Sequence, residues 1–555
     1  MNELEIKTHV THPSLDRWCL SALLLAGALQ NITGRMAMYT DGIHYLDLAN
    51  CWRRGDWWVA VDAFRSPLYP WIAAAWLQIW KPGMEAMFPS IHVLNFLIFA
   101  GVTLCFRFCL QQHIRTAAAR SQADGKTRLD SFSWTVLGWS LYLLASIKLT
   151  PSHQHAPDMM VMGACFLATG FLLRIWRKEA TKWSYLQLGI VLGLGYLTKA
   201  ILFPVSLLYL FSLFILTAKH KQGMVKAFLT VLTFCVVCTP WVIALHWKTD
   251  HWTTGAAGKL NHAWVFVYAG QSKNTSDVQQ GRLISKDPDY FQYNTTAGRT
   301  YAADYDPALW KWNYPVPFNL RDQVHVAVVN LFQYRWFLNY YGAPFVTLIL
   351  FWMFLRGSLL SGVKDLIAEC QVLLPIASVL AGYLLLWVYT RFIGGYFVLI
   401  FMGAFLAMAF EAGSIDVSVL RKAAIAIVAT TMLLHVPDIA NDFRKEESES
   451  RQATQLKVAQ AMQKLGLKPG DTVAVVQRHF WEYWAFLARV HIVASTAEGG
   501  SEDFWKVSQD RRAKIIEAAR STQARWLLVN SAPDKTTEND WVRLGDTGYY
   551  AIPLN

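Results

Sequence analysis

The chain has few charged residues for its length. Asp, Glu, Lys and Arg make up only 16% of its 555 residues, whereas 54% are hydrophobic. An ordinary soluble chain carries roughly 25% charged residues, so most of this chain is expected to lie in lipid. Apolar stretches long enough to cross a hydrocarbon core predict about eleven membrane spans, near residues 17–38, 90–111, 132–150, 157–176, 184–199, 201–217, 227–246, 340–356, 369–389, 393–411 and 422–437.

Cysteine is scarce in the polar segments. Of the eight cysteines, only Cys51 falls in a predicted extracytoplasmic loop, so no disulfide framework is available to the outer segments. Cys235-Val-Val-Cys238 has the spacing of a redox motif, but it lies inside an apolar span, where packing explains it better. The first apolar stretch lacks a small-residue cleavage site. We therefore expect it to be the first span and not a removed signal peptide.

Lysine and arginine are distributed unevenly between the loops. With the N-terminus in the cytoplasm, the loops predicted to be cytoplasmic carry Arg115, Arg120, Lys126, Arg128, Arg174, Arg177, Lys178, Lys182, Lys219, Lys221, Lys226, Arg356, Lys364, Arg421 and Lys422. Cytoplasmic loops retain positive charge. The pattern therefore predicts that loop 39–89, segment 247–336 and the C-terminal tail lie outside the cytoplasm. The net charge of +12 then reflects orientation and contact with anionic lipids, and it indicates no nucleic-acid partner.

The last 115 residues differ from the rest, so we divide the chain into a membrane domain, 1–440, and an extracytoplasmic domain, 441–555. Periodicity and turn residues predict helices at 452–465, 481–489 and 503–520 and strands at 472–476, 491–494, 526–530 and 549–553. This alternation favours a small α/β domain with a partly parallel sheet. It holds no Gly-rich phosphate loop, metal-ligand spacing or nucleophile motif. A lid or acceptor-docking module is the simplest interpretation.

Asp41 stands where the first apolar stretch gives way to a polar, tryptophan-rich loop. A carboxylate at a membrane surface indicates chemistry at the interface, and the mixture of Trp, Arg and acidic residues is typical of headgroup level. Further motifs follow along the chain: Arg65-Ser-Pro-Leu-Tyr-Pro70, Pro157-Asp158, Gly193-Leu-Gly-Tyr-Leu-Thr-Lys199, Thr254-Gly-Ala-Ala-Gly-Lys-Leu-Asn-His-Ala-Trp264, Tyr305-Asp-Pro-Ala-Leu-Trp310 and Thr390-Arg391-Phe392.

In their order, these motifs resemble the GT-C superfamily of polyprenyl-phosphate-sugar glycosyltransferases. The likeness covers most of the membrane part, and it is closest to bacterial family-39-type enzymes, akin to protein O-mannosyltransferases and the lipid A aminoarabinose transferase. The resemblance implies a polytopic α-helical GT-C fold. It also implies an undecaprenyl-phosphate-linked donor, an extracytoplasmic acceptor and a place in the bacterial inner membrane.

The resemblance also implies roles for particular residues. Asp41 matches the catalytic carboxylate, which takes the acceptor's proton. Asp158 matches a second acidic residue and is the other candidate catalytic residue. The donor phosphate would be bound by Lys199, Arg391 and Arg65, since an interfacial cation is costly without an anionic partner. Candidates for substrate binding are His44, Tyr45, Asp47, Tyr69, Lys259 and Asn261.

The chain departs from the resembled pattern at two places. Arg65 stands where the aminoarabinose-transferase group has an acidic residue, which indicates a different acceptor or sugar. His44 and Asp47 replace the Asp-Glu pair of the mannosyltransferases, which argues against a protein acceptor.

Plainer interpretations stay open for each residue. Asp41 and Asp158 could cap helices, and Lys199 and Arg391 could be side chains that snorkel at span ends. His153, together with His155 and Asp158, has a spacing that could ligate a metal, but an ordinary polar loop is the simpler explanation. No cofactor is indicated, and a divalent metal stays open.

The function predicted from the sequence is transfer of a sugar from a polyprenyl phosphate to an extracytoplasmic lipid, glycan or protein. The alternative is a polytopic transporter or flippase, in which intramembrane charges mark a substrate pathway. Against it, the halves show no inverted repeat, and the long segment 247–336 is unlike a compact transporter loop. A polymerase or ligase that uses a diphosphate-linked donor is a third interpretation.

Overall fold

The computed structural model describes residues 12–266, 282–286, 289–293, 298–300, 318–355, 359–368, 370–477, 481–496, 504–531 and 540–554. Each of the predicted apolar stretches contains a helix. These helices are α1 (Pro13–Thr33), α5 (Met87–Asp124), α6 (Ser131–Leu143), α7 (Ser152–Trp176), α8 (Lys182–Thr198), α9 (Leu202–Thr217), α10 (Lys221–Thr249), α13 (Ala343–Leu355), α15 (Cys370–Leu384), α16 (Thr390–Ala407) and α17 (Val417–Gln452).

Two π-helical turns extend the membrane helices. Turn η1 (Leu144–Leu149) continues α6, and η4 (Leu338–Gly342) joins α12 (Leu320–Phe337) to α13. Among the described residues, 7 helices are long and apolar enough to cross a membrane by length and composition. Helices α1, α8, α9 and α15 fall below that length or hydropathy. The chain is an integral membrane protein with a mostly helical fold, as predicted.

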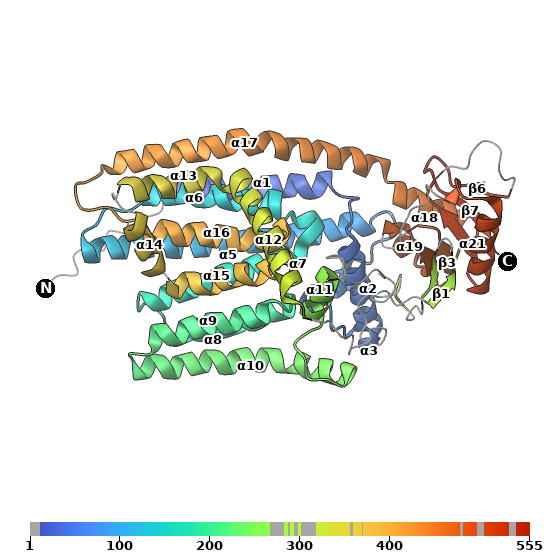
Figure 1. Ribbon diagram of the computed structural model, residues 1–555, viewed down its shortest axis with the longest axis horizontal. Coiled ribbons are helices and arrows are strands. Elements are labelled where there is room, and N and C mark those ends of the chain that lie inside the picture. Colours follow the sequence, from blue (N-terminus) through green and yellow to red (C-terminus); the bar gives the residue numbers. More distant parts are fainter. Residues whose placement is uncertain are drawn as a thin grey trace.

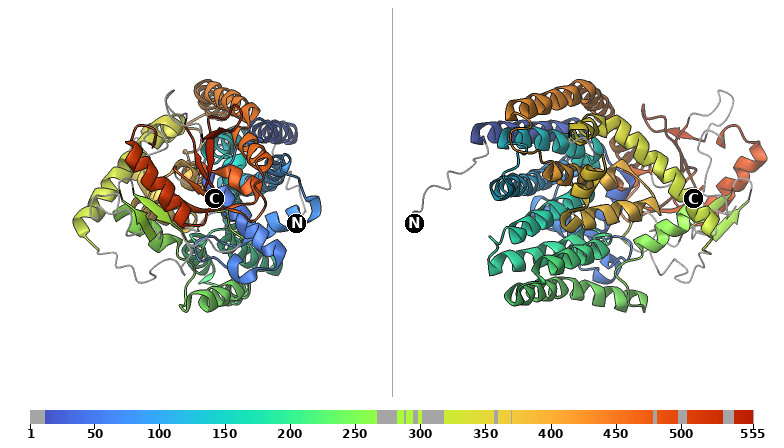
Figure 2. Two further views of the ribbon diagram at one scale, coloured as in Figure 1. Left: turned by 90° about the vertical axis from the view of Figure 1, so that its right-hand side faces the viewer. Right: turned by 60° about the vertical axis from the view of Figure 1, so that its left-hand side comes forward.

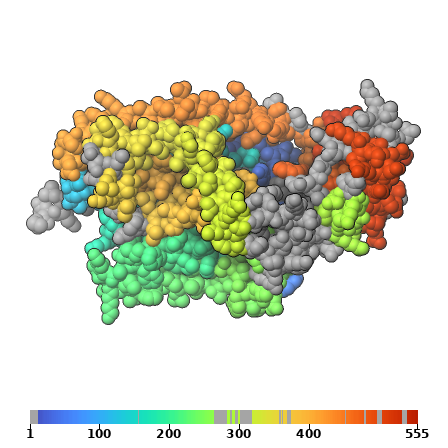
Figure 3. Space-filling view, in the orientation of Figure 1, coloured from blue at the N-terminus to red at the C-terminus, as the bar shows by residue number. Residues whose placement is uncertain are grey.

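The long helices run side by side in one bundle, and the C-terminal sheet lies beyond one end of it (Figures 1 and 2). The space-filling view shows the C-terminal part, in red, at that end of the bundle (Figure 3). Loops that the sequence predicts to be cytoplasmic lie at the opposite end of the bundle. There Lys126 forms an ion pair with Glu411 at 2.9 Å, and Arg421 forms one with Asp130. The basic loops that precede α6 and α17 therefore meet at the end of the bundle opposite the C-terminal sheet.

At the other end, loop 39–89 folds into three helices, α2 (Thr40–Arg54), α3 (Trp57–Ala60) and α4 (Leu68–Trp80). Figure 1 shows α2 turned across the direction of the long helices. Segment 247–336 adds α11 (Ala257–Phe266) at the same end. These elements bring the motif residues of both segments close to the ends of the membrane helices.

The C-terminal part contains the predicted α/β arrangement. Its helices are α18 (Thr454–Lys464), α19 (Tyr483–Ala488) and α21 (Gln509–Ser521). Its strands are β3 (Thr472–Val475), β4 (His491–Thr496), β5 (Trp526–Val529), β6 (Val542–Arg543) and β7 (Tyr550–Pro553). Strand β3 pairs in parallel with β4 and with β5, and β7 pairs antiparallel to β5. The sheet is therefore partly parallel.

Two further strands join this sheet from segment 247–336. Strands β1 (Arg282–Ser285) and β2 (Tyr290–Gln292) extend it to seven strands, in the order β1-β2-β4-β3-β5-β7-β6. The sequence did not predict this contribution.

One apolar core connects the C-terminal part to the membrane part. It contains Ile43 and Leu46 of α2, residues of α4 and the start of α5, and Val458 of α18. Phe88 of α5 stacks on Phe486 of α19 with ring centroids 6.3 Å apart. The boundary that the sequence suggests, 440/441, lies inside α17. The domain division therefore stays a prediction, because a helix and a shared core cross it.

Candidate functional site

Asp41 lies in the first turn of α2, where its carboxylate is close to the positive end of the helix. Its side chain is 27% exposed. Oδ1 accepts a hydrogen bond from Nη2 of Arg65 at 2.7 Å, and Oδ2 accepts one from Nη1 of Arg391 at 2.9 Å. The Asp41 carboxylate therefore bridges two guanidinium groups from different parts of the chain.

A turn that Asp62 caps holds Arg65 in place. Oδ1 of Asp62 accepts hydrogen bonds from the backbone N–H groups of Phe64, at 2.8 Å, and Arg65, at 2.9 Å. Such a side-chain turn fixes the backbone on which the arginine stands. The Arg65 side chain is only 8% exposed, and its guanidinium lies 5.1 Å from the ring centre of Tyr45. It is therefore directed toward Asp41 and not into water.

The second acidic residue, Asp158, belongs to a neighbouring group of charges. Oδ1 of Asp158 accepts a hydrogen bond from Nζ of Lys199, which directly follows α8. Oδ2 lies 4.0 Å from Nη1 of Arg391. A Cβ on Gly394 would come within 2.6 Å of Thr150, and a Cβ on Gly395 would come within 2.6 Å of Met162. The two glycines therefore allow α16 to approach η1 and α7.

These contacts gather Asp41, Arg65, Asp158, Lys199 and Arg391 into one group, here called the charged cluster. Its three cations and two carboxylates leave an excess of one positive charge. Burial raises the pKa of Asp41, but the Arg65 and Arg391 guanidinium groups outweigh burial and hold that pKa well below its usual range. In this state Asp41 is ionised, and the excess positive charge favours an anionic ligand.

The charged cluster forms part of the wall of a small cavity of about 30 Å³. Tyr45, Tyr69, Asn95 and Gln154 line it with polar groups. The Tyr69 hydroxyl donates to Oδ1 of Asn95 at 2.9 Å, and the rings of Tyr45 and Tyr69 meet edge to face at 5.5 Å. The walls of this cavity suit a polar group beside Asp41, but its volume admits only water-sized molecules.

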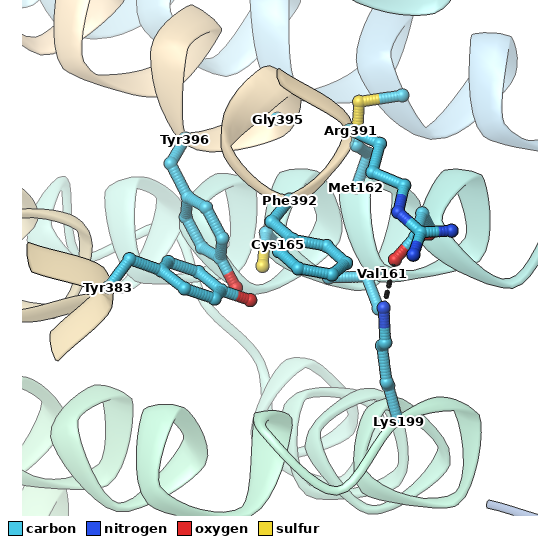
Figure 4. Close-up of a pocket in the computed structure, with 10 residues that line it drawn as sticks. Val161, Met162, Cys165, Lys199, Tyr383, Arg391, Phe392, Gly395 and Tyr396 are labelled. Carbon is cyan, nitrogen blue, oxygen red and sulfur yellow. Dashed lines mark hydrogen bonds and ion pairs between the residues drawn. The ribbon is translucent and has the colours of Figure 1, made fainter. Parts of the chain in front are cut away.

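A second small cavity, of about 10 Å³, lies on the other side of the same charges. Lys199, Arg391 and Asp158 line both cavities, but the remaining walls of this one are mainly apolar and aromatic. Figure 4 shows Lys199 and Arg391 on one side of Phe392, with Tyr383 and Tyr396 on the other side. Lys199 lies 4.3 Å from the ring centre of Phe392. The cations therefore separate a polar cavity from an apolar one.

Four predicted substrate-binding residues do not line either cavity. His44 is buried in α2. Both carboxylate oxygens of Asp47 accept hydrogen bonds from Thr300. Lys259 is exposed on α11, and the amide of Asn261 donates to the backbone of its own helix. Of the predicted substrate-binding set, only Tyr45 and Tyr69 face the polar cavity.

Other residues of the polar cavity were not predicted as substrate-binding residues. Asn95 lies on α5, and the sequence signal would have been a polar amide within a long apolar helix. His153 lies at the start of α7, and its imidazole is 2.9 Å from a carboxylate oxygen of Glu446 on α17. In the described part of the chain, no group of three His, Cys, Asp or Glu residues could hold a metal ion.

Fold and site together define an integral membrane protein with a cluster of charged side chains at the end of its helix bundle that meets the C-terminal α/β sheet. Among solved structures, the chain is similar to the Archaeoglobus fulgidus oligosaccharyltransferase in complex with zinc and sulfate. The TM-score is 0.48 at 10% identity, over 92% of this chain and 68% of that chain.

The chain is also similar to ArnT from Cupriavidus metallidurans. For the structure bound to undecaprenyl phosphate, the TM-score is 0.41 at 11% identity, over 97% of both chains. For the apo structure, it is 0.39 at 13% identity, over 96% of this chain and 98% of that chain. No protein-family model and no curated protein matches the chain. These likenesses concern overall fold and assign neither substrate nor mechanism.

Proposed function

We propose that the chain is a GT-C-type membrane glycosyltransferase. It would move a sugar from polyprenyl (undecaprenyl) phosphate to an extracytoplasmic lipid, glycan or protein. The observation that carries this proposal is the Asp41 carboxylate held between Arg65 and Arg391 at the wall of a polar cavity. Glycosyl transfer needs a base for the acceptor hydroxyl and fixed cations for the leaving phosphate. The charged cluster contains both kinds of group within hydrogen-bonding reach of one another.

The two cavities suggest where each part of the donor would bind. A phosphate bound by Lys199 and Arg391 would lie where the polar and apolar cavities meet, since both residues line both cavities. The sugar would then lie on the side of the polar cavity, beside Asp41. The first part of the isoprenoid chain would lie on the side of the apolar cavity, between α7 and α16. Both cavities would widen on donor binding, because they measure only about 30 and 10 Å³ in the structure. Each part of the donor thus meets walls of matching polarity.

The reaction that fits this arrangement is a single displacement. The acceptor hydroxyl oxygen attacks the anomeric carbon, and the bond from that carbon to the phosphate oxygen breaks. Polyprenyl phosphate leaves as an anion, and Asp41 receives the hydroxyl proton. Attack opposite the leaving group inverts the configuration of the anomeric carbon. Lys199, Arg391 and Arg65 would stabilise the charge that develops on the phosphate.

Donor binding would also make Asp41 a better base. In the structure, two guanidinium groups hold the Asp41 pKa far below its usual range, and a carboxylate paired in this way accepts a proton poorly. A bound phosphate competes for the same two guanidinium groups. As Arg391 and Arg65 turn toward the phosphate, the Asp41 carboxylate loses stabilisation and gains basicity. Proton transfer would therefore follow donor binding.

The orientation completes the proposal. The basic loops at one end of the bundle would face the cytoplasm of a bacterial inner membrane, and the N-terminus would lie on that side. The charged cluster and residues 441–555 would face the periplasm. We infer that the C-terminal domain takes part in acceptor docking, because it packs against the loop helices that carry Asp41.

A deletion strain tests the proposed function directly. We expect one envelope glycoform to be missing and a polyprenyl-phosphate sugar to accumulate, both measured by mass spectrometry of extracted lipids and glycans. The purified wild-type protein should then transfer that sugar to the unmodified acceptor. Movement of the lipid across vesicles without glycosyl transfer would instead support the transporter alternative.

A further inference from the structure

Gly298, Arg299 and Thr300 form a short buried segment between α2 and β4, here called the 298–300 segment. Arg299 and Thr300 are each only 4% exposed. The segment belongs to the long stretch between α10 and α12, far in sequence from the charged cluster. It touches neither cavity, so any effect on the charged cluster has to pass through the residues that it holds.

The first set of contacts fixes α2. The backbone N–H of Thr300 donates to Oδ2 of Asp47 at 2.8 Å, and the Thr300 hydroxyl donates to Oδ1 at the same distance. Nη2 of Arg54 donates to the carbonyl of Gly298 at 3.2 Å. Both α2 residues stand on the helix that carries Asp41 in its first turn. The 298–300 segment therefore fixes the position of this helix at two points.

The second set of contacts fixes the turn that carries Arg65. Nη2 of Arg299 donates to the carbonyl of Val59 at 2.9 Å and to Oδ2 of Asp62 at 3.2 Å. The other oxygen of Asp62 accepts the backbone N–H groups of Phe64 and Arg65. Arg299 thus holds the carboxylate that shapes this turn. From Arg299 the contacts run through Asp62 and Arg65 to Asp41.

The third set of contacts anchors the segment to the C-terminal sheet. The N–H of Ile492 donates to the carbonyl of Thr300 at 2.7 Å. The carbonyl of Arg299 lies within hydrogen-bonding distance of Nδ1 of His491. Both partners belong to β4. The same three residues therefore contact the sheet, the Asp41 helix and the Arg65 turn.

We propose that the 298–300 segment is a positioning element of the transferase, through which the C-terminal sheet sets the geometry between Asp41 and Arg65. Arg299 and Thr300 are its positioning residues, and they act on the reaction through Asp62 and Asp47. This inference rests on the proposed function, since it gives that geometry a role in donor binding. It gives the C-terminal domain a task at the charged cluster in addition to acceptor docking.

The test uses purified full-length protein with undecaprenyl phosphate as the probe. Loss of a hydrogen bond to a charged group costs about 1.5–3 kcal/mol. If most of this free energy is lost from the binding of undecaprenyl phosphate, Arg299→Ala should raise the Kd roughly 10-fold or more. Thr300→Val should raise it severalfold, whereas Thr300→Ser, which keeps the hydroxyl, should bind like the wild type. Gln460→Ala is the matched control, because it removes a contact of 2.8 Å between the C-terminal part and Glu85 that does not involve the segment.

Amide hydrogen exchange of residues 41–47 and 61–66 provides a readout that does not depend on the probe. We expect faster exchange there in Arg299→Ala and exchange like the wild type in Gln460→Ala. Unchanged exchange and unchanged Kd in Arg299→Ala and Thr300→Val would overturn the inference. So would equal losses in Arg299→Ala and Gln460→Ala, because the contact would then be merely structural. A wild-type protein that does not bind the probe would contradict the proposed function, and hydrogen exchange alone would then decide the inference.

Discussion

Nη1 of Arg391 lies 2.9 Å from Oδ2 of Asp41, although the two residues are 350 positions apart in the chain. Arg391 lies in the first turn of α16, and Asp41 lies in the first turn of α2. The pair therefore joins a late membrane helix to the loop that follows α1. Because Arg391 also lies 4.0 Å from Asp158, one guanidinium holds both acidic residues of the charged cluster.

The first prediction separates chemistry from binding at Asp41. Asp41→Asn cannot accept the acceptor proton, so turnover should fall roughly 10²- to 10⁴-fold, the usual contribution of a general base. Binding of undecaprenyl phosphate should persist or tighten, because the substitution removes a negative charge between Arg65 and Arg391. Rates and Kd of the purified variant check this. Asp546→Asn, at an exposed ion pair with Lys457, is the matched control. Turnover like the wild type in Asp41→Asn would remove Asp41 from the proposed mechanism.

The second prediction concerns the donor phosphate. Lys199→Ala and Arg391→Ala should each raise the apparent KM or Kd for the lipid donor roughly 10-fold or more, with little change for the acceptor. Arg391→Lys should recover only part of the loss, since lysine lacks the two-point grip of a guanidinium. Lys226→Ala and Arg421→Lys, at the opposite end of the bundle, serve as controls. If the alanine variants keep the donor dependence of the wild type, these cations only anchor span ends.

The third prediction follows from Asp47. Burial raises its pKa to about 7, although Thr300, Arg299 and Arg54 all act to lower it. An unfolded Asp titrates near pH 4, so between about pH 4 and 7 the folded protein holds a proton that the unfolded chain releases. Stability should therefore fall as pH rises through this range, by up to about 1.4 kcal/mol per pH unit, and level off above it.

The measurement is thermal unfolding of wild type and Asp47→Asn in detergent at several pH values. The wild type should lose stability relative to the variant between pH 5 and pH 7, because asparagine does not titrate. Parallel curves for the two proteins would mean that Asp47 has an ordinary pKa in the folded state.

The fourth prediction concerns orientation. Reporter fusions after residue 128 and after Lys182 should lie in the cytoplasm, and fusions near residue 253 and at the C-terminus should lie outside it. The uneven distribution of Lys and Arg between the loops is the reason. Fusions after Lys226 and Arg421 test the same end independently. A cytoplasmic C-terminus would place the charged cluster on the wrong side of the membrane for an extracytoplasmic acceptor.

Local features of the fold could be predicted from the sequence. The apolar stretches mark the membrane helices because length and hydropathy are properties of a continuous segment. Strands β3, β4, β5 and β7 fall within a few residues of their predicted positions, because the apolar pattern of a strand and the turn residues beside it also belong to one continuous segment. Asp41, Arg65, Asp158, Lys199 and Arg391 could each be named from short motifs. Their roles stay a proposal.

The pairing of these residues depends on the tertiary structure. No sequence pattern shows that Arg391 reaches Asp41, since the contact depends on how closely α16 packs against η1 and α7. Nor did the pattern show that Thr300 would occupy both oxygens of Asp47, or that β1 and β2 would join a sheet almost two hundred residues later in the chain. The sequence by itself determined where the apolar membrane helices and strands β3, β4, β5 and β7 lie and where charge stands at span ends. Only the packing of distant segments decided which charges meet, because hydrogen bonds and ion pairs act over a few ångströms in space, whatever the separation along the chain.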